Sequence, residues 1–340
     1  MSTAKRTLVV GTGSIGLRHL RNLKARLPEH ELLCMPASGR GVVAAEVGAD
    51  RVVADIADAL SGGLFLAIVA SPAPLHLTHT VALVRAGVPV LVEKPLSHSL
   101  AEARVHETLL AGSAKRIQVA YNLRYLRSAA VMKQLIDASI VGRVHHVLAD
   151  VGQYLPSWRP GTDYRRNVSA RKELGGGVLR ELSHEFDYLR WLFGDFDQVF
   201  ASVRRSGALD IDVEDGIDAL FTRDSSTMTV HMDFLQQAVS RQCKVIGETG
   251  TLIWDVARNT VTRLDGGGVP PQVLFDGQAD DRNAMYTAQL DDFIGVAEGR
   301  RTPEVTVVDA LKTLEWIDAI ERSAQTNCPV PLNRHPTPMP

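Results

Sequence analysis

The tripeptide Glu93-Lys94-Pro95 follows an apolar run, Leu91-Val92, and its residue types suggest chemistry. The carboxyl ends of parallel strands are where open α/β sheets bind ligands. A lysine buried there has a lowered pKa and can polarise or protonate a substrate oxygen. In isolation the tripeptide is equally typical of a surface lysine after a strand, so its interpretation depends on the rest of the chain.

The segment Gly11-Thr12-Gly13-Ser14-Ile15-Gly16 has the spacing of a dinucleotide-binding turn. Gly11 permits the tight turn, Gly13 lets the backbone approach a pyrophosphate, and Gly16 lets the helix pack closely on the strand. Ser14 and Ile15 begin a helix whose N-terminal N–H groups face the phosphates. Because a strand-like run precedes and a helical pattern follows, the segment favours a cofactor site over an ordinary glycine-rich turn.

The end of the second expected strand bears on the choice of cofactor. A carboxylate about 20 residues after the glycines would bind the adenosine ribose and favour NAD. The segment 34–40 has no carboxylate, and its Ser38 and Arg40 suit the 2′-phosphate of NADP. Arg40 is also compatible with an ordinary solvated loop cation. The sequence therefore predicts NADP or NAD as the cofactor, with NADP favoured.

Residues 7–121 alternate short β-branched runs with helical patterns. Such alternation indicates βαβ units, and hence a doubly wound parallel sheet of the Rossmann type. Ser99 is a candidate helix N-cap, with Glu102 as its capping-box partner. Strands are expected at 7–10, 31–35, 64–70, 88–92 and 117–121, and helices at 14–26, 41–47, 75–86 and after Ser99.

After about residue 140 the pattern changes to strands with short connections. Several of these alternate in side-chain character, which suits a sheet with two unlike faces. Strands are expected at 144–151, 199–204, 217–222, 227–234 and 241–246, and helices at 178–193, 284–298 and 308–324. The predicted fold class is α/β: a Rossmann dinucleotide-binding domain at 1–125, an α+β substrate-binding and oligomerisation domain with a large, mainly antiparallel sheet at 126–330, and a loose tail at 331–340.

Composition limits the partners of the chain. Across 340 residues, 37 lysines and arginines stand against 39 aspartates and glutamates, which gives a formal net charge of −2. A nucleic acid or an anionic membrane bound across the whole surface would require a basic excess. The three cysteines have no metal-ligand spacing and the histidines are scattered, so neither a metal site nor a disulfide is expected. The chain also lacks an apolar run long enough to span a membrane. We therefore predict a cytoplasmic protein.

Three segments occur in order at plausible distances: VVGTGSIGLRHLRNL, IVASPAPLHLTHTVALVRAGVPVLVEKPLS and GGGVLRELSHEFDYLRWLFG, followed by IGETGTL. Together they resemble the Gfo/Idh/MocA family of NAD(P)-dependent oxidoreductases over nearly the whole chain. The resemblance implies a Rossmann domain followed by a domain whose large sheet often forms the oligomer interface, and hence a homodimer or homotetramer. It also implies a carbohydrate or cyclitol as the small-molecule substrate.

The resemblance implies roles for individual residues. Lys94 matches the catalytic lysine of the family, and Pro95 matches a proline that commonly follows a cis peptide bond. His184 matches the catalytic histidine of the second domain, with Asp187 at the family's acidic position three residues later. The further cofactor-binding positions implied by the matched segments are Ser71, Pro72, His76, Glu93, Lys94 and Asn122.

The expected helix that contains His184 has two unlike faces. One stripe is apolar, whereas Glu181, His184 and Tyr188 lie on the opposite face, flanked by Arg180 and Trp191. A solvated face would rarely hold both aromatic residues, so this side is predicted to line a site or an interface. Family members often place an aspartate four residues before the histidine, where this chain has Arg180. We therefore expect Glu181, three residues before His184, to take the role of that aspartate.

The stretch 153–174 is typical of a long loop and carries five cations against two carboxylates. Aromatic rings together with arginines suit the apolar face of a sugar and an anionic group on that sugar. A solvated basic loop is the alternative. The stretch also looks like a subgroup found in bacterial surface-polysaccharide and nonulosonate pathways. The predicted substrate-binding residues are Arg124, Tyr154, Trp158, Arg159, Tyr164 and Arg165.

The sequence thus predicts an NAD(P)-dependent dehydrogenase or reductase that acts on a CH–OH group of a sugar, sugar acid or nucleotide-linked sugar. His184 is expected to exchange the hydroxyl proton and Lys94 to stabilise the developing oxyanion, or the two exchange these roles. Two alternatives are a non-catalytic dinucleotide-sensing regulatory protein of the same fold, and a glycosidase or epimerase that recycles a tightly held cofactor. The presence of both Lys94 and His184 favours the enzyme over the sensor.

Overall fold

The computed structural model describes residues 5–37 and 41–332. The chain forms two compact units, and each is described by itself: the first holds Met1–Asn122 and Arg282–Leu314, and the second holds Leu123–Asp281 and Glu315–Pro340. Ser38 and Arg40, which the sequence predicts at the cofactor, lie outside the described residues, as do residues 333–340 of the predicted tail.

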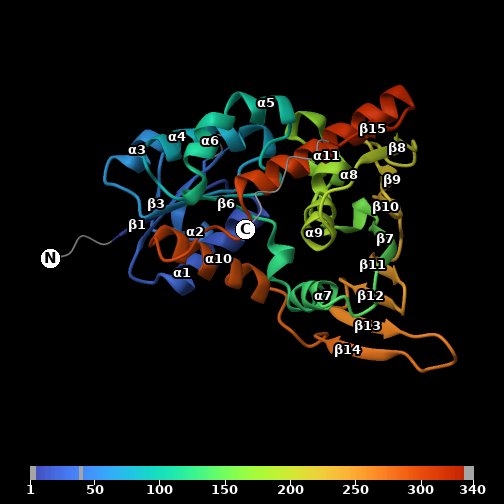
Figure 1. Ribbon diagram of the computed structural model, residues 1–340. Helices are drawn as coiled ribbons and strands as arrows, with labels where there is room; N and C mark the ends of the chain where they lie inside the picture. The colour runs from blue at the N-terminus through green and yellow to red at the C-terminus, as the bar shows by residue number, and fades with distance from the viewer. Residues whose placement is uncertain (1–4, 38–40, 333–340) are drawn as a thin grey trace. The chain divides into compact units, whose positions relative to one another are not determined.

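The first unit contains a six-stranded parallel sheet with the order β3-β2-β1-β4-β5-β6 (Figure 1). The order reverses between β1 and β4, whose last residues, Val10 and Val69, pair in register. Ligands bind at such a switch point, outside the carboxyl ends of the strands. The predicted Rossmann sheet is therefore confirmed. Its strands are β1 Arg6–Val10, β2 Glu31–Met35, β3 Arg51–Val52, β4 Leu66–Val69, β5 Val90–Val92 and β6 Ile117–Val119.

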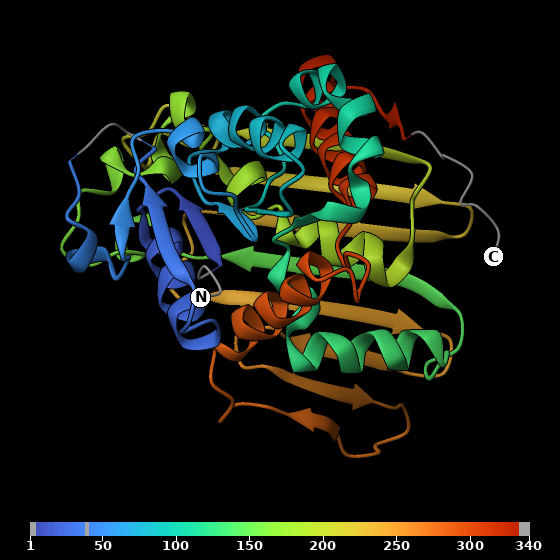
Figure 2. The same cartoon turned by 90° about the vertical axis from the view of Figure 1, so that its left-hand side faces the viewer.

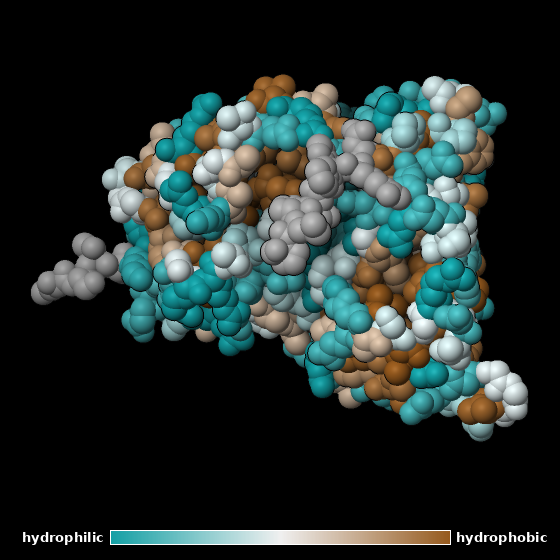
Figure 3. Space-filling view, in the orientation of Figure 1, coloured by the Kyte–Doolittle hydropathy of each residue, from teal (hydrophilic) through white to brown (hydrophobic). Residues whose placement is uncertain are grey.

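Helices connect these strands and cover the sheet. The outer surface of α1 is hydrophilic (Figure 3), whereas its Leu20 and Leu23 are buried. The helix α5 begins after Ser99, whose Oγ accepts a hydrogen bond from the Glu102 backbone N–H at 3.4 Å, which confirms the predicted N-cap. The predicted capping box is wrong, because the Ser99 backbone N–H donates to Oγ of Ser97 and the Glu102 carboxylate accepts from the same hydroxyl group. The helices are α1 Ser14–Arg26, α2 Ala44–Val47, α3 Ile56–Leu60, α4 His76–Arg85, α5 Leu100–Val105 and α6 Glu107–Gly112.

A helix from late in the chain completes the core of the first unit. Leu290 and Phe293 of α10 (Ala284–Ala297) are buried in one cluster with Leu20 and Leu23 of α1. The prediction grouped α10 with the second domain, whereas the structure places it in the first unit. The physical reason is that the apolar side chains of α1 and α10 cover one another.

The second unit is built on a nine-stranded sheet with the order β14-β13-β12-β11-β7-β10-β9-β8-β15 (Figure 2). All neighbouring pairs are antiparallel except β7 and β10, which confirms the mainly antiparallel sheet. The short strands β12 to β14 were not predicted. The strands are β7 Val144–Gly152, β8 Gln198–Arg204, β9 Gly216–Arg223, β10 Ser226–Asp233, β11 Ser240–Gly247, β12 Thr251–Asp255, β13 Thr260–Leu264, β14 Gln272–Asp276 and β15 Val330–Pro331.

The two faces of this second sheet differ. The helices of this unit lie on one side of the sheet (Figure 1), and Met228 and Met232 of β10 are fully buried. The other face, on which the described residues place no helix, exposes Leu148, Phe200 and Leu220 by 38%, 41% and 42%. The strand register puts these three residues in one row across the sheet. An exposed apolar row of this kind suits an interface.

The helix expected at 178–193 is two helices in the structure. The helix α8 covers Val178–Glu181 and α9 covers His184–Phe193, with Leu182 and Ser183 between them. The prediction of one continuous helix is therefore wrong, because the apolar spacing continues through a linker that is not helical. The remaining helices are α7 Arg127–Asp137, which was not predicted, and α11 Val307–Thr326.

Candidate active site

The glycine turn after β1 has the shape that a bound pyrophosphate requires. Gly11 has a φ of +106°, and a Cβ atom there would collide with the backbone of Ala70. A Cβ atom on Gly16 would collide with the Gly11 carbonyl group, whereas one on Gly13 would meet no atom within 4 Å. The turn is therefore closed toward the sheet and open beside Gly13, where the backbone approaches a pyrophosphate in this motif.

The N-terminus of α1 has no side chain that competes for its N–H groups. Gly13 is the N-cap residue, and the first turn holds no acidic residue. The first N–H groups of a helix have no partner within the helix. Those of Ser14, Ile15 and Gly16 can therefore bind phosphate oxygens, as the sequence predicts. The described residues thus fit a dinucleotide at this turn.

The Glu93-Lys94-Pro95 turn follows β5, and its Lys94–Pro95 bond is cis, as the resemblance implied. The Glu93 backbone N–H donates to the Val69 carbonyl group at 2.8 Å, which ties the turn to the end of β4. Oε2 of Glu93 accepts a hydrogen bond from the Lys94 backbone N–H at 3.3 Å. Oε1 of Glu93 lies 2.8 Å from Nε2 of His19, a residue that is only 1% exposed. His19 was not predicted, although its place one helical turn after Gly16 was an available signal.

Three more of the predicted cofactor residues follow the strands β4 and β6. Ser71 comes two residues after β4, is 7% exposed, and its Oγ lies 3.1 Å from Nδ1 of His79. Pro72 immediately precedes the short turn Ala73–Leu75. Asn122, 5% exposed, opens the turn Asn122–Tyr125 after β6. These residues therefore lie at the carboxyl edge of the first sheet.

His76 opens α4 and is 2% exposed. Its Nδ1 lies 2.7 Å from the Pro95 carbonyl oxygen, and its Nε2 lies 2.7 Å from the Ser71 carbonyl oxygen. Burial lowers the pKa of His76, although the two carbonyl groups and the Glu93 carboxylate act in the opposite direction. Because both ring nitrogens face protein acceptors, His76 joins two turns of the backbone, whereas the sequence placed it among the cofactor ligands.

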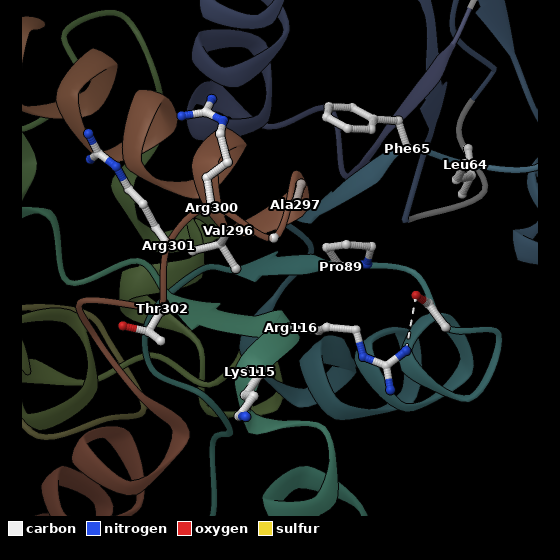
Figure 4. A pocket seen from close by; sticks show the side chains of 12 residues that line it. Leu64, Phe65, Pro89, Lys115, Arg116, Val296, Ala297, Arg300, Arg301 and Thr302 are labelled. Atoms are coloured by element: carbon white, nitrogen blue, oxygen red, sulfur yellow. Dashed lines mark hydrogen bonds between the residues drawn. The ribbon is translucent and has the colours of Figure 1, made fainter.

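A hollow of about 670 Å³ lies at the opposite edge of the first sheet, where β4, β5 and β6 begin (Figure 4). Arg300 pairs with Glu298, and Arg301 bonds to Asp292 at 2.9 Å, so carboxylates outside the hollow neutralise both arginines. Its lining residues include Phe65, Pro89, Lys115, Arg116, Arg300 and Arg301. Since open sheets of this class bind ligands at the carboxyl edge, this hollow is not the candidate active site.

In the second unit, the break between α8 and α9 places Glu181 and His184 on two different helices. Glu181 ends α8, and its Oε2 accepts a hydrogen bond from Oγ of Ser169 at 3.0 Å. His184 is the first residue of α9 and is half-buried. Of the three predicted catalytic residues, Lys94 belongs to the first unit, and Glu181 and His184 belong to the second.

Two buried carboxylates fix the first turn of α9. Asp187 accepts hydrogen bonds from Nε and Nη2 of Arg124 at 2.9 and 2.7 Å. Glu185 accepts hydrogen bonds from Nε and Nη2 of Arg241 at 2.7 and 2.9 Å. The sequence placed Arg124 at the substrate, and the structure shows that two of its nitrogens bind Asp187. Glu185 was missed because nothing in the local sequence indicates a partner 56 residues away.

Tyr188 belongs to the core of the second unit. Its ring is 1% exposed and meets the ring of Trp254 edge to face, with 4.9 Å between the ring centres. Burial raises the pKa of Tyr188 well above its usual range. The prediction that Tyr188 lines a site or an interface is therefore wrong: Tyr188 lies one turn after His184 on the same helix, α9, but its side chain is packed in the core. Trp191 is half-buried, and the Arg124 guanidinium lies 5.7 Å from its ring centre.

The predicted substrate loop, residues 153–174, is a series of short 3-10 turns connected to the segment 205–215. Arg165 donates to Asp163 at 2.8 and 2.9 Å and lies 3.5 Å from Asp210. The Tyr164 hydroxyl oxygen accepts a hydrogen bond from the Asp210 backbone N–H at 3.2 Å. Of the four carboxylates in the segment 205–215, Asp210 and Asp212 contact the loop, and they offset part of its excess of positive charge.

The aromatic side chains of this loop pack within the protein. Nε1 of Trp158 donates to the Gln153 carbonyl group at 3.0 Å, and its ring meets that of Phe234 with 5.2 Å between centres. Tyr154 is half-buried, whereas Arg159 is exposed. Of the predicted substrate residues on this loop, Trp158, Tyr164 and Arg165 thus have partners inside the protein, and Tyr154 and Arg159 remain the candidates for a ligand.

A half-buried carboxylate that was not predicted holds the start of α8. Oε1 of Glu214 accepts a hydrogen bond from the Leu179 backbone N–H at 3.1 Å, and the Glu214 carbonyl group accepts one from Val178 at 3.2 Å. Burial raises the pKa of Glu214 above its usual value. A Cβ atom at the neighbouring Gly177 would collide with this carboxylate, so the glycine makes room for it.

The described ranges, 5–37 and 41–332, contain no group of three or more histidines, cysteines, aspartates and glutamates that could hold a metal ion. No helix in these ranges is long and apolar enough to cross a membrane. Cys34 and Cys243 are buried free thiols, and Cys328 is an exposed one.

Two family models match this chain. Residues 5–121 match the GFO/IDH/MocA model described as an oxidoreductase family with an NAD-binding Rossmann fold. Residues 129–253 match the GFO/IDH/MocA C-terminal domain. The chain belongs to the GFO/IDH/MocA oxidoreductase family. The family predicted from the three sequence segments is therefore confirmed.

Curated members of the GFO/IDH/MocA family are similar over most of the chain. Inositol 2-dehydrogenase 3 of Saccharopolyspora erythraea is 31% identical over 254 residues, which cover 72% of this chain and 71% of the relative. The scyllo-inositol 2-dehydrogenase (NAD(+)) of Bacillus subtilis is 24% identical, with 96% of both chains covered.

Solved structures of two dehydrogenases share the fold. Levoglucosan dehydrogenase in complex with NADH has a TM-score of 0.83 at 18% identity, covering 98% of this chain and 100% of the other. The WlbA dehydrogenase from Bordetella pertussis, in complex with NADH and UDP-GlcNAcA, has a TM-score of 0.80 at 23% identity with the same coverage. These likenesses confirm the two-part α/β architecture.

Proposed function

We propose that this protein is an NAD(P)-dependent dehydrogenase or reductase that acts on a CH–OH group of a small neutral sugar or cyclitol. The observation that carries the proposal is the Glu93-Lys94-cis-Pro95 turn at the same edge of the first sheet as a glycine turn that is open beside Gly13. A lysine at that edge lies where Rossmann sheets bind their ligands. The curated relatives named as dehydrogenases support the same chemistry.

When bound, the nicotinamide supplies or accepts the hydride. Lys94 stabilises the negative charge that develops on the substrate oxygen, and His184 takes the hydroxyl proton in oxidation and returns it in reduction. In the second form of this proposal the roles are exchanged: His184 stabilises the negative charge and Lys94 exchanges the proton. Glu181, whose carboxylate is held by Ser169 at 3.0 Å, takes the place of the aspartate that other members of the family carry.

The pairing of Arg165 with carboxylates of the protein supports a neutral substrate. Arg165 lies 3.5 Å from Asp210, and the backbone N–H of Lys172 donates to Asp212 at 2.8 Å. The loop therefore offers less positive charge to a ligand than its sequence suggests. The names of the curated relatives, which are inositol dehydrogenases, support a cyclitol. A sugar acid or a nucleotide-linked sugar, as in the WlbA complex, is the alternative, and the nonulosonate context belongs to it.

The choice between NADP and NAD depends on the segment after β2. The strand ends at Met35, and residues 36–40 hold no carboxylate for a ribose hydroxyl. We therefore propose that NADP is used, whereas the NADH of the levoglucosan dehydrogenase complex supports NAD. Arg40→Ala is expected to lower kcat/KM for NADP about 10-fold or more, because a charge-assisted hydrogen bond contributes roughly 1.5–3 kcal/mol. An equal loss with both dinucleotides contradicts the preference for NADP.

We also propose a homodimer or homotetramer formed through the open face of the second sheet. The exposed row of Leu148, Phe200 and Leu220 supports this interface. Leu220→Lys is expected to yield a smaller species by light scattering, and an unchanged mass contradicts the interface. The free thiols Cys34, Cys243 and Cys328 support the proposed cytoplasmic location.

The deciding experiment is the absorbance of reduced nicotinamide, with NAD and NADP each tested against neutral sugars, cyclitols, sugar acids and a UDP-linked sugar acid. We expect turnover with a neutral polyol.

Lys94→Ala should lower kcat by about 10²–10⁴-fold, the range for loss of one acid–base or electrostatic group, and leave dinucleotide binding nearly intact. Undiminished turnover in that variant contradicts the role of Lys94. Tight dinucleotide binding without hydride transfer to any substrate favours the regulatory protein, and a co-purifying cofactor that never accumulates in reduced form favours the glycosidase or epimerase.

A further inference from the structure

Two buried histidines converge on the turn that carries Lys94, and they come from different helices of the first unit. His19 lies on α1 and is 1% exposed, and His76 opens α4 and is 2% exposed. Neither ring faces solvent, so neither is an ordinary surface histidine. Buried polar groups of this kind are kept where their hydrogen bonds fix a particular geometry.

His19 acts on the turn through Glu93. Its Nε2 lies 2.8 Å from Oε1 of Glu93, and Oε2 of Glu93 accepts from the Lys94 backbone N–H at 3.3 Å. Nδ1 of His19 is buried and has no hydrogen-bond partner within the described ranges. The tautomer that fits this arrangement carries its hydrogen on Nε2 and donates it to the carboxylate. The side chain of His19 thus holds the carboxylate that holds the backbone of Lys94.

His76 acts on the other end of the turn. Its Nδ1 lies 2.7 Å from the Pro95 carbonyl oxygen, and its Nε2 lies 2.7 Å from the Ser71 carbonyl oxygen. Carbonyl oxygens only accept hydrogen bonds, so a neutral ring donates to one of them at a time and a doubly protonated ring donates to both. The doubly protonated ring therefore bridges the residues that follow β4 and β5, whereas the neutral ring holds one of the two turns at a time. Lys94 therefore lies between two points that the histidines anchor.

We propose that His19 and His76 are positioning residues that hold the Glu93-Lys94-Pro95 turn and thereby set the place of the Lys94 side chain. The inference rests on the proposed function, in which Lys94 acts on the substrate oxygen. Neither histidine touches that oxygen in this scheme: each acts through the backbone of the turn. A small displacement of a catalytic group costs up to about 100-fold in rate.

The test uses matched pairs of variants in the full chain. His19→Leu and His76→Leu remove the donors, whereas His19→Gln and His76→Gln each keep one N–H donor. We expect kcat to fall about 10- to 100-fold in the Leu variants, with the dissociation constant for the dinucleotide changed less than about 3-fold. The Gln variants should recover most of kcat. His106→Leu, which replaces a half-buried histidine at the end of α5, is the control.

Hydrogen exchange of peptides that cover residues 93–98, followed by mass spectrometry, gives a readout that does not depend on activity. We expect faster exchange in both Leu variants than in the wild-type protein, His106→Leu and the Gln variants. Unchanged exchange in both Leu variants overturns the proposal, whatever the turnover. Accelerated exchange in a protein that transfers hydride to no substrate would leave the bracing of the turn intact and reject the proposed function, so the two failures are distinguishable.

Discussion

The turn that carries Lys94 and the helix that begins with His184 are held in place by different kinds of interaction. Around Lys94, two imidazole rings bind a carboxylate and two backbone carbonyl groups. Around His184, two carboxylates of α9 each accept two hydrogen bonds, from Nε and Nη2 of one arginine. The first arrangement uses mostly uncharged partners, whereas the second buries two carboxylates and Arg124 and leaves Arg241 partly exposed.

The difference predicts where each region is sensitive. A hydrogen bond between neutral groups contributes only about 0.5–1.5 kcal/mol to stability. A buried ion pair that loses one partner leaves an uncompensated charge, which costs about 3–5 kcal/mol. We therefore expect changes near Lys94 to act mainly on the rate, and changes near the start of α9 to act mainly on the stability of the second unit.

Arg124→Met should have the largest effect on stability. It leaves the carboxylate of Asp187, 1% exposed, without its bidentate partner, and we expect the free energy of unfolding to fall by about 3–5 kcal/mol in a urea titration. Arg26→Met, which breaks a pair with Asp291 whose partners are 45% and 48% exposed, is the control and should cost less than about 1 kcal/mol. Equal losses in the two variants would remove the distinction between buried and exposed pairs.

His19→Leu should have a smaller effect on stability. The change takes a donor from Glu93, which is 9% exposed, and an unsatisfied buried acceptor costs about 1–3 kcal/mol. The same urea titration measures it, beside His19→Gln, which keeps a donor. If His19→Leu lowers the free energy of unfolding as much as Arg124→Met does, the stability contributed by the turn depends on charge as strongly as that contributed by α9.

Replacement of both partners of the second ion pair should be nearly neutral. Arg241→Met alone leaves Glu185, which is 0% exposed, as a buried unpaired charge. Adding Glu185→Leu removes that charge, and apolar replacements of buried pairs are often neutral or stabilising. We expect the double variant to regain at least about 2 kcal/mol relative to Arg241→Met, as a double-mutant cycle would report. Simple additivity of the two losses contradicts this expectation.

Glu214→Gln should give the smallest change, and its sign depends on pH. Burial raises the pKa of Glu214 above 4.5, so the folded chain binds this proton more tightly than the unfolded chain. The resulting stabilisation is present below pH 4.5 and is lost as the pH rises through the folded pKa. Glutamine stays neutral, so the variant should gain stability relative to wild type between pH 4 and pH 7. A difference that does not vary with pH would contradict the raised pKa.

Features fixed by local backbone chemistry were predictable from the sequence. The glycine turn at 11–16, the strand β2 and the Ser99 cap follow from residue types a few positions apart, and the structure has them. The match to three ordered segments was sufficient for the family.

Features fixed by partners far along the chain were not predictable. The break at Leu182 and Ser183 keeps an unbroken apolar spacing, so periodicity alone could not reveal it. Arg124 and Arg165 have the residue type of an anion ligand, and only the fold brings Asp187 and Asp210 to them. Charge counted along a loop is therefore a poor measure of the charge that the folded loop presents.

The place of α10 has a consequence for how the chain folds during synthesis. Leu290 and Phe293 complete the core around α1, yet the ribosome makes them more than 260 residues after Leu20 and Leu23. The Rossmann sheet therefore emerges with one apolar flank uncovered and stays so until the last part of the chain arrives. A nascent chain in this state exposes apolar surface and is prone to aggregate until α10 has been made.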